Sequence, residues 1–426
     1  MNIEELYQLY LQHPSVATDT RKLKEGDLFF ALRGPNFNGN EFAEKALASG
    51  AAYAVIDDQR YSVAGKTIVV VDALQTLQLL AKHHRQQFTI PFIAITGSNG
   101  KTTTKELVHA VLSSTFQTYT TEGNLNNHIG VPLTILKIAN NAEMAVIEMG
   151  ANHQQEIASY CLVALPTHGL ITNCGKAHLE GFGGVDGVRK GKGELFQFLR
   201  QYNGGAFVMW DYDYLRDMSK GIQTVVSYGT QDAQIEGHAV KSDPFVEVEF
   251  TKGFTGTIKT NMVGDYNTPN ILAAVAVGKF FKVDEEKIRK AIENYRPSNS
   301  RSQLIEKGTK KIILDAYNAN PSSMKLAIEN LGRSGEKNKV LILGAMAELG
   351  SESFAEHTAI VEEIEQYSWE HVLLVGNEFE KTEHPFIQLN SAEEAGKWLA
   401  KQQLENTYIL VKGSRSMQME RSIEHL

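Results

Sequence analysis

Cysteine is scarce in this sequence. Only Cys161 and Cys174 occur among 426 residues, and neither belongs to a Cys-x-x-Cys pair. A disulfide framework and a cysteine-ligated zinc site are therefore disfavoured. We expect both side chains to be small buried residues of a protein from a reducing compartment.

The sequence also has no excess of basic residues and no long apolar run. It holds 42 Lys and Arg against 50 Asp and Glu, a net charge of −8. Nucleic acid is disfavoured as the main partner because a phosphate backbone calls for a basic surface, whereas small anionic substrates need only a local cluster of donors. Neither a signal peptide nor a run of transmembrane length is found. We expect a cytoplasmic protein, without membrane insertion and monomeric by default.

The chain is too long for one ordinary hydrophobic core, and short apolar runs alternate with helical patterns along it. This arrangement predicts an α/β protein of three domains. We expect a small α/β domain over residues 1–87, a central P-loop ATPase-like domain with a parallel sheet over 88–297, and a Rossmann-like domain over 298–426. No Gly-x-Gly-x-x-Gly fingerprint follows the first strand of the last domain, so a second dinucleotide site is unsupported.

A glycine-rich turn after the apolar run 92–96 is the most informative motif. The run predicts a buried strand and the residues after the turn predict a helix, so backbone N–H groups and the helix dipole can bind phosphate. Lys101 is expected to reach the β- and γ-phosphates, and the Thr102 hydroxyl to ligate Mg²⁺. Ile95 stands where the full P-loop pattern has its first glycine. The alternative is an ordinary glycine-rich turn, which would not need both Lys101 and Thr102.

Two further candidates follow predicted strands. Glu148 closes the run 144–149, where a carboxylate reaches the ligand-binding edge of a parallel sheet and can hold Mg²⁺ directly or through water. Its alternative role is to cap the next helix. His178 follows the strand predicted at 169–172 and opens on the same edge. It can ligate a metal, position a phosphate or, as is commoner for a single histidine, serve as a structural residue.

Two other segments stay ambiguous from their residues. Residues 189–196 predict a solvated basic stretch at a helix start, and their spacing alone demands no catalysis. Residues 121–132 hold three asparagines bounded by glycines. Those amides can bind a polar ligand or can serve turn geometry.

These segments occur together and in this order in the Mur ligases, the ATP-dependent amide ligases of peptidoglycan precursor synthesis. The chain resembles that family over its whole length, with supporting matches at 175–180, 192–194, 348–350 and 412–415. Segments 122–132 and 315–324 favour the family member that adds D-Ala-D-Ala to UDP-MurNAc-tripeptide. The resemblance implies that ATP phosphorylates the tripeptide carboxylate, and that the dipeptide amine then displaces phosphate to give the pentapeptide, ADP and phosphate.

The resemblance also implies residue roles. It implies catalytic roles for Lys101, Glu148, His178 and Lys192. ATP-binding positions are Gly97, Ser98, Asn99, Gly100, Lys101, Thr102, Thr103, Asn267, Asn270, Arg301 and Asp315. Positions for the UDP-muramoyl peptide and the dipeptide are Thr18, Asp19, Thr20, Arg21, Asn38, Gly39, Asn124, Asn126, Asn127, Asn318 and Asn320.

Two Mg²⁺ ions are implied, with Thr102, Glu148, His178 and a carbamylated Lys192 as ligands. A free ammonium repels Mg²⁺, whereas a carbamate is an anionic oxygen ligand. Its formation requires a neutral amine, which neighbouring cations favour.

The chain departs from the family pattern at several positions. Tyr266 stands where His is usual, Ala345 replaces a usual Asp, and Asn38 and Asn40 stand where Asp and His are common. Two other interpretations stay open: another amide ligase, such as a different Mur ligase or a folylpolyglutamate synthase, and a P-loop binding or regulatory protein without ligase activity. The third residue of the tripeptide, diaminopimelate or lysine, is not defined by the sequence.

Overall fold

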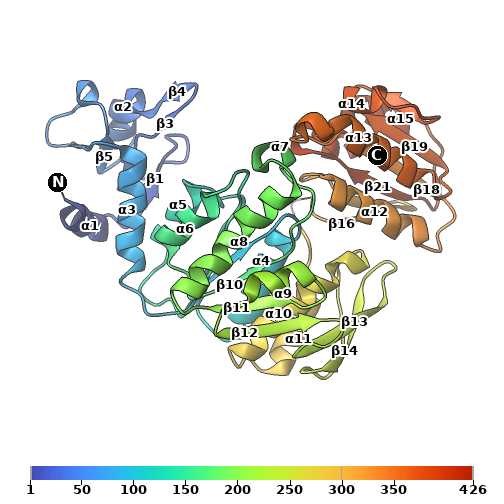
Figure 1. Ribbon diagram of the computed structural model, residues 1–426. Coiled ribbons are helices and arrows are strands. Elements are labelled where there is room, and N and C mark those ends of the chain that lie inside the picture. Colours follow the sequence, from blue (N-terminus) through green and yellow to red (C-terminus); the bar gives the residue numbers. More distant parts are fainter. Residues whose placement is uncertain (1, 299, 425–426) are drawn as a thin grey trace.

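The short apolar runs of the chain form three separate main sheets, which follow one another along the sequence (Figure 1). This computed structural model describes residues 2–298 and 300–424. Each sheet lies inside one of the three predicted segments, and the α/β prediction is confirmed. The boundaries at 87/88 and 297/298 stay predictions. We call the three parts the N-terminal, central and C-terminal units.

The N-terminal unit contains a four-stranded parallel sheet in the order β1-β2-β5-β6 and a separate hairpin, β3-β4. Leu28 and Phe30 of β2 pack with α1 and α3, while Phe29 packs with α2 on the other face. Both faces are thus covered, which explains why β2 is apolar throughout. The elements are α1 (Ile3–Gln12), β1 (Val16–Ala17), β2 (Leu28–Phe30), β3 (Arg33–Gly34), β4 (Phe37–Asn38), α2 (Ala43–Ala48), β5 (Tyr53–Ile56), β6 (Thr67–Val69) and α3 (Ala73–Arg85).

The central unit is built on a nine-stranded sheet in the order β15-β14-β13-β12-β11-β10-β7-β9-β8. Strands β7 to β13 form the parallel part of the sheet, and β14 and β15 extend it antiparallel, which confirms the antiparallel patch predicted near 245–260. The strands are β7 (Phe92–Thr96), β8 (Thr118–Thr120), β9 (Met144–Glu148), β10 (His168–Ile171), β11 (Gly205–Met209), β12 (Thr224–Gly229), β13 (Ile235–Lys241), β14 (Glu247–Lys252) and β15 (Gly256–Lys259).

Helices cover this sheet, with α4, α8 and α10 in contact with its strands (Figure 1). The helices are α4 (Lys101–Ser113), α5 (Gly130–Leu136), α6 (Glu156–Ala164), α7 (Leu179–Phe182), α8 (Val185–Gln201), α9 (Asp213–Ser219), α10 (Thr268–Phe280) and α11 (Glu285–Asn294). Since β7 has parallel partners on both sides that come later in the chain, the strand order reverses around it. Such a point is where open α/β sheets bind ligands.

The C-terminal unit has the predicted Rossmann-like alternation. Its sheet order is β16-β17-β21-β18-β19-β20, parallel except for the edge strand β16. The strands are β16 (Gln303–Lys307), β17 (Lys310–Asp315), β18 (Lys339–Gly344), β19 (His371–Val375), β20 (Ile387–Leu389) and β21 (Tyr408–Lys412). The helices are α12 (Pro321–Arg333), α13 (Ser353–Ile364), α14 (Asn377–Glu380) and α15 (Ala392–Leu399), with the 3₁₀ turns η4 (Gly350–Glu352) and η6 (Met419–Ile423).

Both cysteines are buried thiols, as predicted. Within residues 2–298 and 300–424, no helix combines the length and the apolar character needed to cross a bilayer. The expectations of a cytoplasmic location and a monomer stay predictions.

A buried arginine joins the N-terminal and central units. Arg85, at the end of α3, donates from Nε to the Ala164 carbonyl at 2.8 Å and from Nη2 to the Leu165 carbonyl at 2.9 Å. Its guanidinium also lies 3.7 Å from the centre of the Phe92 ring. Burial lowers the pKa of Arg85 to about 10, so it stays charged at neutral pH. The cation therefore satisfies carbonyls at the C-terminal end of α6, where the helix dipole is negative.

We expect Arg85→Met to loosen this junction, because it leaves buried carbonyls without donors. The stability of the protein should fall by about 3 kcal/mol, measured by chemical denaturation. Arg60→Met is the control, since Arg60 is exposed and pairs with Asp58 in its own turn. Equal stability of the two variants would show that Arg85 does not hold the units together.

Candidate active site

The carboxyl ends of three parallel strands meet at one edge of the central sheet. Ile95 of β7 is in register with Glu148 of β9, and Thr96 with Ile171 of β10. The segments that follow these strands are therefore neighbours, although they begin at three separate places in the sequence, after Thr96, Glu148 and Ile171. We call residues 97–103 the phosphate loop and residues 172–178 the bridging loop.

The bridging loop holds the phosphate loop in shape. The Asn173 carbonyl accepts from the Ser98 N–H at 2.9 Å, and its Oδ1 accepts from the Asn99 N–H at 3.0 Å. Thr172 Oγ1 donates to the Asn99 carbonyl at 2.6 Å. A Cβ on Gly97, which has φ +142°, would lie 2.0 Å from Thr172 Oγ1. Glycine is required at this position because the two loops approach so closely.

Lys101 lies folded over the phosphate loop. Its Nζ donates to the carbonyls of Gly97 at 2.8 Å and Ser98 at 3.1 Å. Burial, together with the positive charge of Arg301, lowers the pKa of Lys101, while Glu148 opposes this shift. Thr102 is buried in the first turn of α4, as expected for a phosphate-loop hydroxyl. An anion at this position would meet two cations and the N-terminus of α4.

Glu148 is buried, with 1% of its surface exposed, and is held from two sides. Asn126 Nδ2 donates to its Oε1 at 2.7 Å, and its backbone N–H donates to Thr121 Oγ1 at 2.9 Å. Its Oε2 is buried without a hydrogen-bond partner in the described part of the chain. A buried carboxylate oxygen with no donor fits a hard cation such as Mg²⁺. The described residues form no group of three or more His, Cys, Asp or Glu able to hold a metal.

The burial of Lys192 shows that the prediction of a solvated basic stretch at a helix start was wrong for this residue. It lies inside α8 with 1% of its surface exposed, and only Arg189 and Lys190 of that stretch face solvent. Its Nζ donates to the Ala151 carbonyl at 3.0 Å and lies 5.0 Å from the Phe182 ring centre. Burial and the nearby charge of Lys101 lower the pKa of Lys192 to about 7. The helix pattern could not show this burial, because Phe182 and Ala151 come from other segments.

His178 has left-handed backbone geometry, with φ 52°, and its Nδ1 forms an ion pair with Glu348 of the C-terminal unit. This contact lowers the pKa of Glu348. Glu348 is also left-handed, with φ 61°. Two non-glycine residues in a sparsely populated conformation meet across the interface, a pattern that occurs at functional contacts.

The predicted adenine-side asparagines turn inward. Asn270 Oδ1 accepts from Thr104 Oγ1 at 2.9 Å, and Asn270 Nδ2 donates to Asn267 Oδ1 at 2.9 Å. Both are buried and fix the start of α4 against α10, so their predicted contact with adenine stays a prediction. Tyr266, at the departure from the usual histidine, shares a 3.0 Å hydrogen bond with Ser302.

Arg301 and Asp315 behave differently from each other. Arg301 stacks 3.6 Å from the centre of the Tyr317 ring, and its charge reaches Lys101. Asp315 pairs with buried Lys412 and accepts from the Ser302 N–H at 3.0 Å. Arg301 is thus placed toward the phosphate loop, whereas Asp315 organises the start of the C-terminal unit. Ala345, at the departure from Asp, is buried and its carbonyl accepts from Ser414 Oγ at 2.6 Å.

The asparagines of the substrate prediction divide into two groups. Asn320 Nδ2 donates to Asn99 Oδ1 at 2.7 Å, so Asn320 lies at the phosphate loop, whereas Asn126 contacts Glu148 at the end of the neighbouring strand β9. Asn127 Oδ1 accepts from the Gly130 N–H at 2.9 Å, at the start of α5. Asn124 and Asn318 are exposed.

The predicted UDP-binding residues lie in the N-terminal unit, apart from this edge. Thr18 and Thr20 flank Asp19, which forms an exposed 2.7 Å ion pair with Arg21. A Cβ on Gly39 would lie 2.2 Å from the Leu32 carbonyl, so this turn requires glycine.

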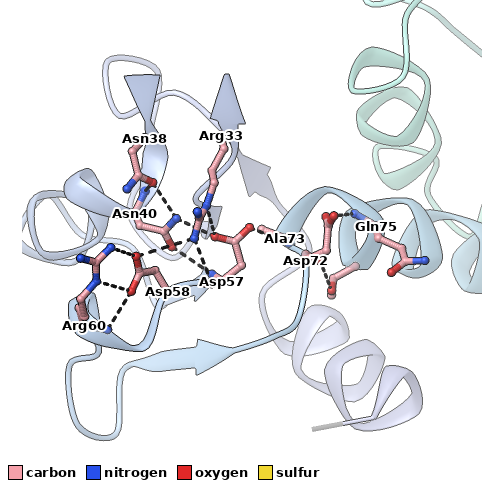
Figure 2. Close-up of polar contacts among 10 residues, drawn as sticks. Arg33, Asn38, Asn40, Asp57, Asp58, Arg60, Asp72, Ala73 and Gln75 are labelled. Atoms are coloured by element: carbon pink, nitrogen blue, oxygen red, sulfur yellow. Dashed lines mark hydrogen bonds and ion pairs between the residues drawn. The ribbon is translucent and has the colours of Figure 1, made fainter. Parts of the chain in front are cut away.

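Figure 2 shows the polar cluster beside that turn. Asp57 Oδ1 accepts from Asn40 Nδ2 at 2.7 Å and from Arg33 Nε at 2.7 Å, and Asn38 Oδ1 accepts from Asn40 Nδ2 at 2.8 Å. Asn40, one of the departures from the family pattern, is therefore a buried structural bridge.

Sequence reasoning missed several residues that shape the site. Asn173 and Thr172 follow β10 directly, and their position at the carboxyl end of a parallel strand could have indicated that they belong to the site. Glu348 belongs to a segment that supported the resemblance, but its partner and that of Arg33 could not be predicted, because those partners lie in segments distant in sequence.

Three family models match the chain, one in each unit. They are the Mur ligase family catalytic domain over residues 14–85, the Mur ligase middle domain over 95–278, and the Mur ligase glutamate ligase domain over 300–415. The chain belongs to the Mur ligase family, as the resemblance implied.

Relatives with the same printed name match most of the chain. The UDP-N-acetylmuramoyl-tripeptide–D-alanyl-D-alanine ligase of Escherichia coli is 36% identical over 97% of this chain and 93% of its own length. The Bacillus subtilis enzyme of that name is also 36% identical, over 82% of this chain and 79% of its own.

Solved structures agree. MurF from Acinetobacter baumannii superimposes with a TM-score of 0.86 at 29% identity, covering 98% of this chain and 97% of its own. MurF from Thermotoga maritima in complex with ADP gives 0.87 at 27% identity, covering 97% of each chain. The ligase class and three-unit architecture expected from the sequence are thus confirmed.

The geometry predicts that Gly97→Ala weakens nucleotide binding, because the added Cβ would collide with Thr172 and displace the phosphate loop. We expect ATP affinity to fall roughly tenfold or more, measured by isothermal titration calorimetry. Gly65→Ala is the matched control: its φ is +70°, and its Cβ would meet nothing within 4 Å. An unchanged affinity in Gly97→Ala would contradict the described loop conformation as the binding form.

Proposed function

We propose that this protein is the Mur ligase that joins D-Ala-D-Ala to UDP-MurNAc-tripeptide with hydrolysis of ATP to ADP and phosphate. The supporting observation is a partly buried phosphate loop whose Lys101 lies within electrostatic reach of Glu148, a carboxylate with one oxygen that has no hydrogen-bond partner among the described residues. The names of the relatives supply the substrate class. A cytoplasmic location and a monomeric state belong to the same proposal.

The proposed reaction has two steps. A carboxylate oxygen of the tripeptide attacks the γ-phosphorus, the bond from that phosphorus to the β–γ bridging oxygen breaks, and ADP leaves. The dipeptide amine then attacks the acyl carbon of the acyl phosphate, loses a proton, and expels inorganic phosphate. Because both first reactants are anions, Lys101 and Arg301 reduce their repulsion and hold them in line.

Mg²⁺ fits the oxygen donors that Thr102, Glu148 and a carbamylated Lys192 would supply, with His178 as a nitrogen ligand. Thr102 and the free Oε2 of Glu148 would hold one ion, and His178 with Lys192 would hold a second, where each ion would neutralise phosphate charge. Asn126 positions the Glu148 carboxylate through its 2.7 Å hydrogen bond.

Lys192 would serve as a ligand only after carbamylation. Burial and Lys101 lower its pKa to about 7, which supplies the neutral amine that attacks CO₂. The nitrogen forms a bond to the carbon of CO₂ and loses a proton, so that a cation becomes an anion.

The decisive test is phosphate release from ATP and Mg²⁺ with UDP-MurNAc-tripeptide, with and without D-Ala-D-Ala. We expect release to require both substrates and to yield the pentapeptide by mass spectrometry. Parallel assays with diaminopimelate- and lysine-containing tripeptides define the third residue.

The same assay separates the alternatives. Release with glutamate and a folate, or with another UDP-muramoyl peptide and its amino acid, would assign a different amide ligase. ATP binding without release under any combination would indicate a binding protein and would overturn the proposal.

Lys192→Ala should lose activity at least about 100-fold, because the carbamate ligand is removed, and short-chain carboxylic acids should restore part of it. In the wild type, ¹³C NMR in labelled bicarbonate should show more carbamate as pH rises through about 7, since the amine is protonated below its pKa and neutral above it. Lys190→Ala, an exposed neighbour on α8, is the control. Full activity of unrescued Lys192→Ala would refute the carbamate.

A further inference from the structure

The bridging loop contacts the C-terminal unit as well as the phosphate loop. The Lys176 N–H donates to Ser322 Oγ at 3.0 Å, and Lys176 Nζ forms a 2.5 Å ion pair with Glu356 of α13. A Cβ on Gly175 would lie 2.9 Å from Ser322 Oγ, so the two units are in close contact there. In Figure 1, α7, which follows this loop, lies beside the C-terminal unit.

The same loop is bonded to the phosphate loop on its other side. Ser98 Oγ donates to the Gly175 carbonyl at 3.0 Å, one residue before Lys176. The position of the C-terminal unit is therefore transmitted to the phosphate loop through a short covalent path. Asn320 and Arg301, which the C-terminal unit and its connection bring to that loop, depend on this position.

Lys176 and Glu356 form an ion pair across this contact, and neither residue is one of the proposed metal or nucleotide ligands. The Glu356 side chain is 10% exposed and the Lys176 side chain 50% exposed, so the pair is partly shielded from water. A shielded, short ion pair is stronger than an exposed one, and across an interface it fixes orientation.

We propose that Lys176 and Glu356 are positioning residues: their ion pair holds the C-terminal unit against the bridging loop and so keeps Arg301 and Asn320 beside the phosphate loop. Lys176 acts through this docking and contacts no reacting atom. Breaking the pair leaves the other contacts of the interface in place, so docking becomes weaker and more frequently lost.

A matched control exists inside the C-terminal unit. Lys325 forms a 3.0 Å ion pair with Glu363, with side-chain exposures of 55% and 5%, close to those of Lys176 and Glu356. Lys325 and Glu363 lie on α12 and α13, so this pair does not cross between units. Lys325→Ala therefore removes a similar charge pair without affecting docking.

Hydrogen–deuterium exchange of the substrate-free protein tests the docking directly. The N–H groups of Lys176 and Glu180 both donate across the interface, the second to the Glu348 carbonyl at 3.4 Å. In Lys176→Ala, exchange in peptide 176–182 should rise about fivefold, with no such change in Lys325→Ala. Equal exchange in the two variants would overturn the proposal.

The kinetic test rests on the proposed ligase function. Lys176→Ala should lower kcat/KM for D-Ala-D-Ala about fivefold and weaken ATP binding measured by calorimetry by a similar factor, because ATP meets Arg301 beside the phosphate loop only in the docked arrangement. The reversed pair Lys176→Glu with Glu356→Lys should recover most of the loss in both exchange and rate. Failure of the reversed pair in a protein with wild-type melting temperature would contradict an ion pair as the cause. An inactive wild type with the expected exchange pattern would reject the function and keep the docking.

Discussion

The parallel arrangement of β7, β9 and β10 is the constraint on which the rest of the site depends. The phosphate loop, Glu148 and the bridging loop belong to separate parts of the sequence and meet only because their strands end at one edge of the sheet. Backbone bonds then make the meeting specific, since Asn173 holds the N–H groups of Ser98 and Asn99. A shift of register in either neighbour of β7 would separate these groups.

The charges at this edge are arranged for an anionic ligand. The charge of Arg301 acts on Lys101, the charge of Lys101 acts on Lys192, and burial lowers the pKa of both lysines. Glu148 near Lys101, and Glu156 and Glu194 near Lys192, oppose the lowering of these pKa values but do not cancel it. A triphosphate would supply the missing negative charge, and a carbamate on Lys192 would change one cation into an anion. The same burial that makes these positive charges costly to the protein thus strengthens their interaction with phosphate.

Strands and turns that are defined by neighbouring residues could be predicted from the sequence, whereas side-chain environments that depend on tertiary contacts could not. Local sequence was sufficient to predict the strands β7, β9, β17 and β21 and the glycine-rich turn after β7, because each is defined by neighbouring residues. The burial of Lys192 could not be predicted, since it depends on Phe182 and Ala151, which lie in other segments. Asn267 and Asn270 show the same limit: their amide groups bond to protein atoms, and their predicted contact with adenine stays a prediction.

The bridging loop connects the chemistry of the edge to the position of the C-terminal unit. His178 and Glu348 meet there with left-handed backbones on both sides, so the contact carries conformational strain that its ion pair must offset. If the C-terminal unit moves away, His178 loses its carboxylate partner at the same time as the phosphate loop loses Asn320. A ligand that contacts both His178 and Asn320 therefore favours the docked arrangement, since the separated units do not offer both contacts. Docking and ligand binding are then coupled through this one loop, without any requirement that the central sheet itself change.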